Sequence, residues 1–357
     1  MRKLYLENWL GAYFRDSLAR CCRAKHDGPK HVIFQFVDHF ELAGKPPRLS
    51  EWLLKYPVLA SRHKDADGAP PKHTWFYALD LMREDELVKL KALVSAGFGE
   101  IELHWHHRHD TAESFQEKLR AGLKIFQQYG FMRPIKEGVD GCFGFIHGNW
   151  SLNNSRGNQF CGVDNEIELL KRAGCYGDFT FPALYCAAQP SMVNSIYYAS
   201  FQKGTAGYSK GREAAVGIKE AEKEFMIFQG PLTINWRDWR FKWHPVIENG
   251  DIGITCTHSD PVRIDAWIRQ GICVQGRPDW VFVKVFCHGG QDHQYVLGEA
   301  TDQMFSYLEE QYNDGKKYVL HYVTSREAYN MVKAAEDGKS GDPHIYRDYI
   351  IHHSLKR

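Results

Sequence analysis

The 357-residue chain is predicted to be an α/β protein, a single deformed (β/α) barrel of seven to eight mostly parallel strands. Short apolar runs rich in β-branched and aromatic residues alternate with segments of helical periodicity, as expected for strands buried on both faces. The connections are short, and no Pro/Gly/Ser-rich linker divides the chain. No GxGxxG or GxxxxGK[ST] motif follows any of these runs, which disfavours a nucleotide-binding Rossmann fold.

The predicted strands are the short continuous apolar runs. In chain order they span residues 31–38, 74–79, 100–106, 142–147, 177–181, 225–230, 252–256, 280–287 and 317–323. Helices are predicted between many of them because capping residues mark their ends. Asp110 and Thr111 precede an amphipathic stretch that stops at Gly130, and Thr324 with Glu327 forms a capping box.

Two segments fall outside this alternation. Residues 183–222 are polar and poorly periodic, so we expect an excursion over the barrel mouth, in a domain that spans residues 26–357. Residues 1–25 are expected to contain an amphipathic helix that either packs on its own domain or serves as an interfacial anchor or oligomer contact. Its apolar face comprises Leu6, Trp9, Leu10, Tyr13 and Phe14.

The composition disfavours several classes of partner. Lys plus Arg number 45 against 44 Asp plus Glu, so no charge excess favours nucleic acid or an anionic membrane. No apolar run approaches the roughly 20 residues that span a bilayer, and the start of the chain lacks a signal peptide. The nine cysteines include no CxxC pair, which indicates reduced thiols. We expect a cytoplasmic protein, with the N-terminal helix as the route to any peripheral membrane attachment.

The run ELHWHHRHD at 102–110 contains four of the 18 histidines: His104, His106, His107 and His109. In a strand, His104 and His106 share one face, and at the C-terminal end of a barrel strand that face points into the mouth. Imidazoles at this spacing suit a divalent metal such as Zn²⁺. The alternative is an inert histidine-rich patch.

Two further strand ends carry side chains suited to acid–base chemistry. Asp38 and His39 end the first strand, with Glu41 nearby, although Asp38 would alternatively cap the next turn. His288 ends the run VFVKVF and is followed by two glycines, which let the backbone turn sharply. This placement suits a general acid or base, and the alternative is a histidine that binds loop carbonyls.

A fourth strand end, FIHGNW, suits sugar recognition. His147 and Asn149 offer hydrogen-bond partners for hydroxyl groups, and Trp150 offers an aromatic face, unless it belongs to the core. His258, which follows IGITCT, is a weaker candidate of the same kind.

These motifs together resemble the polysaccharide deacetylase (NodB-type) superfamily, which includes carbohydrate esterase family 4. The strings that carry the resemblance are VDHFE at 37–41, HGNW at 147–150, GCYGDFTFP at 174–182 and YVTSREAYNMV at 322–332. The resemblance extends from about residue 30 to 337. It implies a deformed (β/α) barrel with a divalent metal, usually zinc, that removes an acyl group from an amino sugar.

The chain departs from the family pattern at the residues that would bind the metal. The family's first motif ends in two aspartates, a base and a ligand, whereas Asp38-His39 stands here and leaves those roles open. The family spaces two histidine ligands four residues apart. Here the candidate pairs are His104 with His109, or His106 with either His109 or Asp110.

The resulting hypothesis is a zinc-dependent hydrolase that deacylates an amino sugar of a glycan or surface polysaccharide precursor. Asp38 and His288 are the predicted catalytic residues, and carbohydrate is the predicted partner. The predicted ligands are drawn from His39, His104, His106 and His109. The alternatives are a glycosidase on a similar barrel, which requires two carboxylates flanking one bond, and a non-catalytic carbohydrate-binding barrel.

Overall fold

The computed structural model describes residues 3–21, 27–201, 207–240, 244–253 and 260–355. Its centre is a mostly parallel sheet in the order β11-β12-β1-β2-β3-β4-β5-β8-β6-β7, with β13 also paired to β1. The strands are β1 Lys30–Phe40, β2 His73–Ala78, β3 Gly99–Trp105, β4 Phe143–His147, β5 Cys175–Asp178, β6 Ile196–Ser200, β7 Gly211–Glu213, β8 Glu224–Phe228, β11 Asp251–Ile252, β12 Trp280–Cys287 and β13 Tyr318–Val323. A separate antiparallel hairpin pairs β9 Thr233–Arg240 with β10 His244–Glu248.

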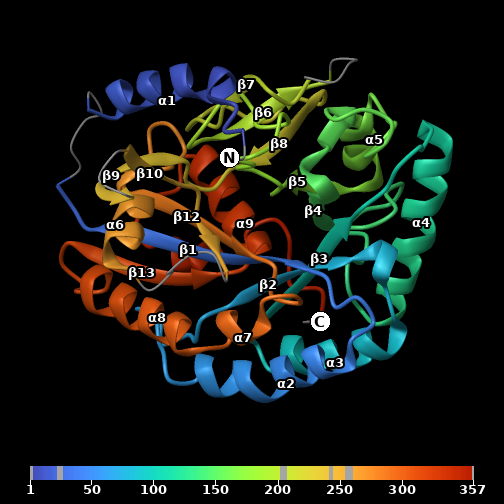
Figure 1. Cartoon of the computed structure of the whole chain (residues 1–357), viewed down its shortest axis with the longest axis horizontal. Helices are drawn as coiled ribbons and strands as arrows, with labels where there is room; N and C mark the ends of the chain where they lie inside the picture. Colours follow the sequence, from blue (N-terminus) through green and yellow to red (C-terminus); the bar gives the residue numbers. More distant parts are fainter. Residues whose placement is uncertain (1–2, 22–26, 202–206, 241–243, 254–259, 356–357) are drawn as a thin grey trace.

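Helices α2, α3, α4 and α8 lie along the outside in Figure 1, whereas α9 lies near the middle and is almost wholly buried. They are α1 Leu6–Cys21, α2 Pro46–Ala60, α3 Glu84–Ser95, α4 Ala112–Gln128, α5 Glu166–Ala173, α6 Pro261–Arg269, α7 His293–Val296, α8 Glu299–Tyr312 and α9 Ser325–Glu336. Short 3₁₀ turns are η1 Leu79–Leu81, η2 Gly148–Trp150, η3 Leu152–Asn154 and η4 Pro343–Tyr346. The capping box predicted at Thr324 and Glu327 begins α9.

The α/β class and the mostly parallel sheet are confirmed, and each predicted apolar run overlaps a strand. Hydrogen bonds do not close the sheet between β8 and β12 among the described residues, so a closed barrel is not confirmed. Side chains span this opening instead. The Lys284 Nζ donates to the carbonyls of Phe179 and Phe181, and the Phe228 and Phe282 ring centroids lie 5.6 Å apart.

Strand β1 positions the candidate site because its neighbours change along its length. One edge pairs with β12, whereas the other pairs first with β13 and then, from Phe36 onward, with β2. Successive residues face opposite sides. Val37 belongs to one apolar cluster, which includes residues of α9, whereas Phe36 and Phe40 belong to another, which includes residues of α2, α3, α4 and α8. His39 and Asp38 therefore point in opposite directions.

The prediction for residues 183–222 needs correction. Instead of an irregular polar excursion, this segment supplies β6 and β7, which extend the sheet in antiparallel fashion from β8. Tyr197, Tyr198 and Tyr208 are buried, and the Phe181 and Tyr208 rings stack with centroids 5.1 Å apart. The segment was misjudged because aromatic residues among polar neighbours carry its core contacts.

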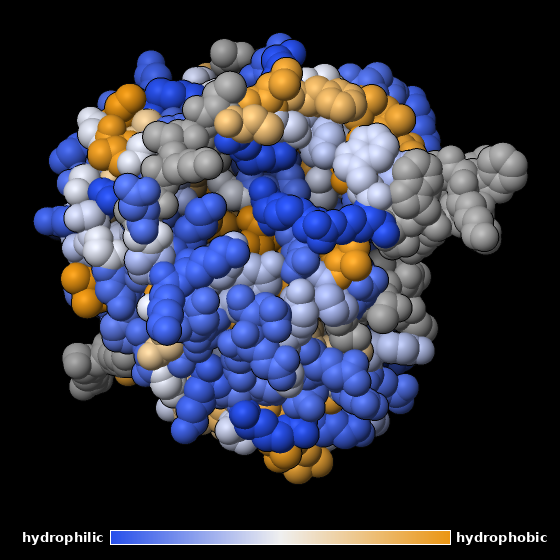
Figure 2. Space-filling model, turned by 90° about the vertical axis from the view of Figure 1, so that its left-hand side faces the viewer, coloured by the Kyte–Doolittle hydropathy of each residue, from blue (hydrophilic) through white to orange (hydrophobic). Residues whose placement is uncertain are grey.

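Helix α1 packs on its own chain through one face. Trp9 and Tyr13 are buried against Leu184, Val193 and Leu232, and the Tyr13 hydroxyl lies 3.2 Å from Thr233 Oγ1. Phe14 and Leu18 remain exposed, at 50% and 70%. On the face shown in Figure 2, apolar residues form small groups separated by hydrophilic ones. No helix within the described ranges is long and apolar enough to span a membrane.

Glu102 on β3 leads to a prediction about stability and pH. Its buried carboxyl group accepts hydrogen bonds from the Tyr176 hydroxyl and the Gly144 N–H, both at 2.5 Å. Burial outweighs these bonds and raises the pKa of Glu102 from 4.5 to about 8. Its contribution to stability is therefore fully present below pH 4.5 and is lost as the pH rises through about 8.

The Glu102→Gln variant should lose this pH dependence because glutamine cannot ionise. Denaturant unfolding across that pH range should show the free energy of unfolding of the wild type falling more steeply than that of the variant. Parallel profiles for the two proteins would contradict the assignment.

Candidate active site

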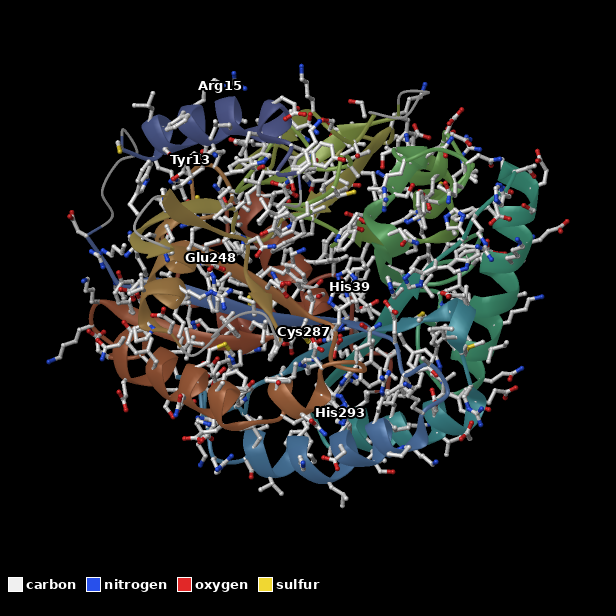
Figure 3. All side chains as sticks on the ribbon, in the orientation of Figure 1. Tyr13, Arg15, His39, Glu248, Cys287 and His293 are labelled. Carbon is white, nitrogen blue, oxygen red and sulfur yellow. The ribbon has the colours of Figure 1, made fainter. Side chains whose placement is uncertain are left out.

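Four histidines gather where β1, β3 and β12 end. The His39 ring centroid lies 4.8 Å from that of His288 and 5.1 Å from that of His104, and His104 and His106 are 4.5 Å apart. Figure 3 shows His39 near the middle of the molecule, close to Cys287 at the end of the neighbouring strand β12. The structure therefore brings these four strand-end histidines together.

Glu41 and two of these histidines, His104 and His106, form a group that could hold a metal ion. Glu41 Oε1 lies 3.3 Å from His104 Nε2 and 3.4 Å from His106 Nε2, and the three donor atoms are all within 4.8 Å of one another. The His104 side chain is fully buried, whereas the side chains of Glu41 and His106 are 15% and 27% exposed. The set is thus enclosed on one side and accessible on the other.

Hydrogen bonds orient both imidazoles. The His104 Nδ1 donates to the Ile146 carbonyl at 2.9 Å, and the His106 Nδ1 lies 3.3 Å from Asp80 Oδ1. A carbonyl oxygen only accepts, so His104 Nδ1 carries the proton and its Nε2 lone pair faces Glu41. Burial lowers the pKa of His104, although a hydrogen bond to Glu41 acts to raise it. The lowered pKa favours the neutral imidazole.

A divalent cation fits these side chains. A nitrogen lone pair facing a carboxylate oxygen is unfavourable unless a cation lies between them, and second-shell partners of this kind are typical of metal-bound histidines. Burial acts to raise the pKa of Glu41, but His104 and His106 outweigh it and keep its pKa below the usual value. Two imidazoles and one carboxylate with an open side match catalytic zinc sites.

The predicted ligands are only partly brought together. His104 and His106 belong to the set, and His39 lies beside it but outside the converging donor atoms. His109 is exposed at a backbone φ of 53°, and its N–H donates to the Asn158 carbonyl. Asp110 binds Lys118 and Ser114 instead. Neither His109 nor Asp110, the predicted partners of His104 and His106, therefore reaches the site. Glu41, which the sequence analysis noted only as lying near Asp38, completes the group instead.

The expectation that Asp38 opens onto the mouth also needs correction. Its carboxylate is fully buried on the opposite side of β1 from His39. Asp38 Oδ1 accepts the Gly289 N–H at 2.7 Å, and Oδ2 lies 3.0 Å from His73 Nε2. A Cβ at position 289 would lie 2.1 Å from Asp38 Oδ2, so glycine is required there by close approach. Asp38 thus holds the backbone immediately after His288.

We therefore expect Asp38 to act as a positioning residue. The Asp38→Ala variant should lose about 10²-fold in kcat, because small displacements of a reacting group are that costly, while its metal content and KM stay close to those of the wild type. Asp38→Asn retains the oxygen that accepts the Gly289 N–H and should recover much of the loss. Steady-state kinetics and metal analysis of both variants check this, and loss of metal from Asp38→Ala would contradict it.

His288 is half-buried and lies between acidic groups. Its charge acts on the carboxyl groups of both Glu41 and Asp251. Burial raises the pKa of Asp251, and the charge of His288 opposes that rise. The Gln291 and Asp292 N–H groups donate to the His288 carbonyl and shape the turn that presents the ring. This placement suits proton transfer at the open side of the ligand set.

An open pocket of about 420 Å³ adjoins His106. Its other lining residues are Asp80, His107, Arg108, Asn149, Gln159 and Phe160. Of the predicted sugar-binding residues, Asn149 lines this pocket, and the Trp150 ring centroid lies 6.5 Å from that of His39. His147 does not take part, because it is fully buried behind β4. His258 lies outside the described residues.

Four pocket residues were not predicted from the sequence: Asp80, Arg108, Gln159 and Phe160. The signal for Asp80 was present, because this residue directly follows a predicted strand, as His288 does. The remaining three lie in loops whose course depends on packing. No motif marks them.

No family model and no curated protein matches the chain. Among solved structures it is similar to a 4-alpha-glucanotransferase from Thermococcus litoralis, with 10% identity and a TM-score of 0.42 over 82% of this chain. The chain spans 39% of the length of that protein. It is also similar to a GH57 branching enzyme from Thermococcus kodakaraensis, with 11% identity and a TM-score of 0.34, over 83% of this chain and 73% of that one. TM-scores below 0.5 do not establish a shared fold, so neither likeness bears on the activity of this chain.

Proposed function

We propose that the protein is a metal-dependent hydrolase whose ion is held by Glu41, His104 and His106. The observation that carries this proposal is the orientation of the two imidazoles, whose Nε2 atoms converge on Glu41 Oε1 while Ile146 and Asp80 hold their Nδ1 atoms. A Zn²⁺ held by these three residues would supply a Lewis acid for a substrate carbonyl and for the attacking water.

The neighbouring histidines would take different roles. Burial, reinforced by the charge of His288, lowers the pKa of His39 well below its usual value, so His39 is a neutral imidazole that lines the enclosed side. His288 reaches the accessible side, where a ring nitrogen would accept the proton that the attacking water loses and then donate it, as the general acid, to the departing amine. Gln291, whose Nε2 lies 3.0 Å from Glu41 Oε2, holds the carboxylate from the same turn.

We further propose that the substrate is an N-acylated amino sugar. The resemblance of VDHFE and HGNW to deacetylase motifs supports this reaction. The pocket beside His106 supports a carbohydrate because Arg108, Asn149 and Gln159 offer donors for hydroxyl groups, and Phe160 offers an aromatic face. The acyl group would lie toward the ligand set and the sugar toward this pocket.

Oligomers of N-acetylglucosamine test the proposal. The zinc-loaded protein should release acetate and free amine in equal amounts, a chelator should abolish the release, and added Zn²⁺ should restore it. Acetate release that is unaffected by complete removal of metal would contradict the mechanism. Absence of release from every acetylated amino sugar would contradict the substrate.

A glycosidase is the second candidate, and one pair of groups favours it. Glu41 has a lowered pKa and Asp251 a raised one, and both interact with His288. Two carboxyl groups whose environments separate their pKa values are typical of the base and acid of glycoside hydrolysis. The same reaction mixtures discriminate the candidates, since a glycosidase would release reducing ends without acetate and would tolerate the chelator.

A further inference from the structure

A second group of potential ligands lies where β3 and β4 end, and it shares no member with the Glu41 group. It consists of four buried side chains, none more than 1% exposed: His107, His147, Cys161 and Glu166. His107 and His147 come from the ends of β3 and β4, Cys161 from the following loop, and Glu166 from the first turn of α5. Their donor atoms all lie within 4.8 Å of one another.

Glu166 is the centre of this group. Its Oε1 lies 2.8 Å from His107 Nε2 and 3.3 Å from His147 Nε2, and its Oε2 lies 3.7 Å from Cys161 Sγ. Two imidazoles, a thiol and a carboxylate are the ligands that zinc prefers. All four are inaccessible to solvent, which is typical of structural rather than catalytic zinc sites.

The orientation of His147 indicates that a cation belongs here. Its Nδ1 donates to the Gly148 carbonyl at 2.5 Å, so its Nε2 carries a lone pair. That atom is buried, has no hydrogen-bond partner among the described residues, and faces a carboxylate oxygen. The contact is favourable only with a positive charge between the two atoms.

An imidazolium at His107 is the alternative source of positive charge. Burial opposes that charge, while Asp110, Cys161 and Glu166 favour it and raise the pKa of His107. A protonated His107 would pair with Glu166, but it would leave His147 Nε2 without a partner. A metal ion satisfies both imidazoles, the thiolate and the carboxylate together, with Asp110 Oδ2 behind His107 Nδ1 at 3.2 Å.

We propose that these four residues bind a second, structural metal ion of the zinc class, at what we call the closed site. The ion would tie loop 148–165 to the ends of β3 and β4. That loop carries Asn149, Gln159 and Phe160, which line the pocket beside His106. The closed site would therefore maintain the pocket wall. It is distinct from the Glu41 site because the two groups share no ligand: His106 contacts Glu41, whereas His107 contacts Glu166.

Cobalt titration of the metal-free protein tests the closed site. We expect two equivalents of Co²⁺ to bind, one of them with the near-ultraviolet charge-transfer absorption of a cobalt–thiolate bond. Cys161→Ser should lose this absorption and one equivalent. His104→Ala should keep the absorption and lose the other equivalent, so failure of the Glu41 site and failure of the closed site are distinguishable.

Cys287→Ser is the matched control, because Cys287 is also buried and lies beside Asp38 and His73. It should retain the absorption. Loss of the band from Cys287→Ser, its retention in Cys161→Ser, or its absence from the wild type would overturn the proposal. If Cys161→Ser does not fold, absence of the band from the wild type, or its loss from Cys287→Ser, still overturns the proposal.

Trypsin gives a second readout that does not depend on activity. Arg156 is the single Lys or Arg in loop 148–165, and its guanidinium donates to the Asn149 carbonyl at 2.7 Å. Zinc-loaded wild type and His104→Ala should resist cleavage after Arg156, and removal of zinc should make both susceptible. Equal cleavage rates with and without zinc would contradict a structural role.

Discussion

Replacing His104 by alanine is expected to abolish hydrolysis and to lower the affinity of the Glu41 site for Zn²⁺ by more than about 100-fold, because even second-shell partners contribute about 10–100-fold. His104 is fully buried, and its Nδ1 is held by the Ile146 carbonyl, so no other side chain can easily replace its Nε2. Metal analysis after dialysis and calorimetric titration with Zn²⁺ measure the effect.

His109→Ala is the matched control for this prediction. His109 lies in the same histidine-rich run but is exposed and outside the ligand set. This variant should keep its metal and its activity. Equal losses in both variants would contradict the ligand set, as would an active His104→Ala protein that retains zinc at the Glu41 site.

Replacing His288 by alanine is expected to reduce kcat by about 10²–10⁴-fold, the usual contribution of a general acid, without loss of zinc. The ring is half-buried, lies 4.8 Å from His39, and does not belong to the converging donor atoms. His288→Gln retains a hydrogen-bond donor but cannot titrate, so it should remain nearly as inactive.

The pH profile separates this role from a structural one. The limb of the kcat profile that reports the acid should disappear in both His288 variants, while metal content and thermal midpoint remain unchanged. Loss of zinc would identify His288 as a ligand instead. Normal activity would identify it as a structural histidine.

The sequence predicts the sheet well because its parallel strands are buried on both faces, and burial leaves a continuous apolar run such as 280–287. It also predicts which strand ends bring histidines together, because parallel strands deliver their C-terminal ends to one side. It fails for β7, which is the polar run GRE, and for β6, where hydropathy alone does not reveal that Tyr197 and Tyr198 are buried.

The direction of each side chain is the part that the sequence does not determine. Asp38 and His39 are adjacent, and only the pairing of β1 with β12 and β2 decides which of them faces the interior. The residues of the proposed closed site could not be predicted from the sequence for a related reason. Cys161 and Glu166 lie far along the chain from His107, and no CxxC or similar motif marks their approach.

Anomalous diffraction at the zinc absorption edge, from crystals of active zinc-loaded protein, is the most direct test of the proposed metal site at Glu41. We expect an anomalous peak bounded by Glu41 Oε1, His104 Nε2 and His106 Nε2. Crystals of active protein with no peak between these three atoms would contradict it.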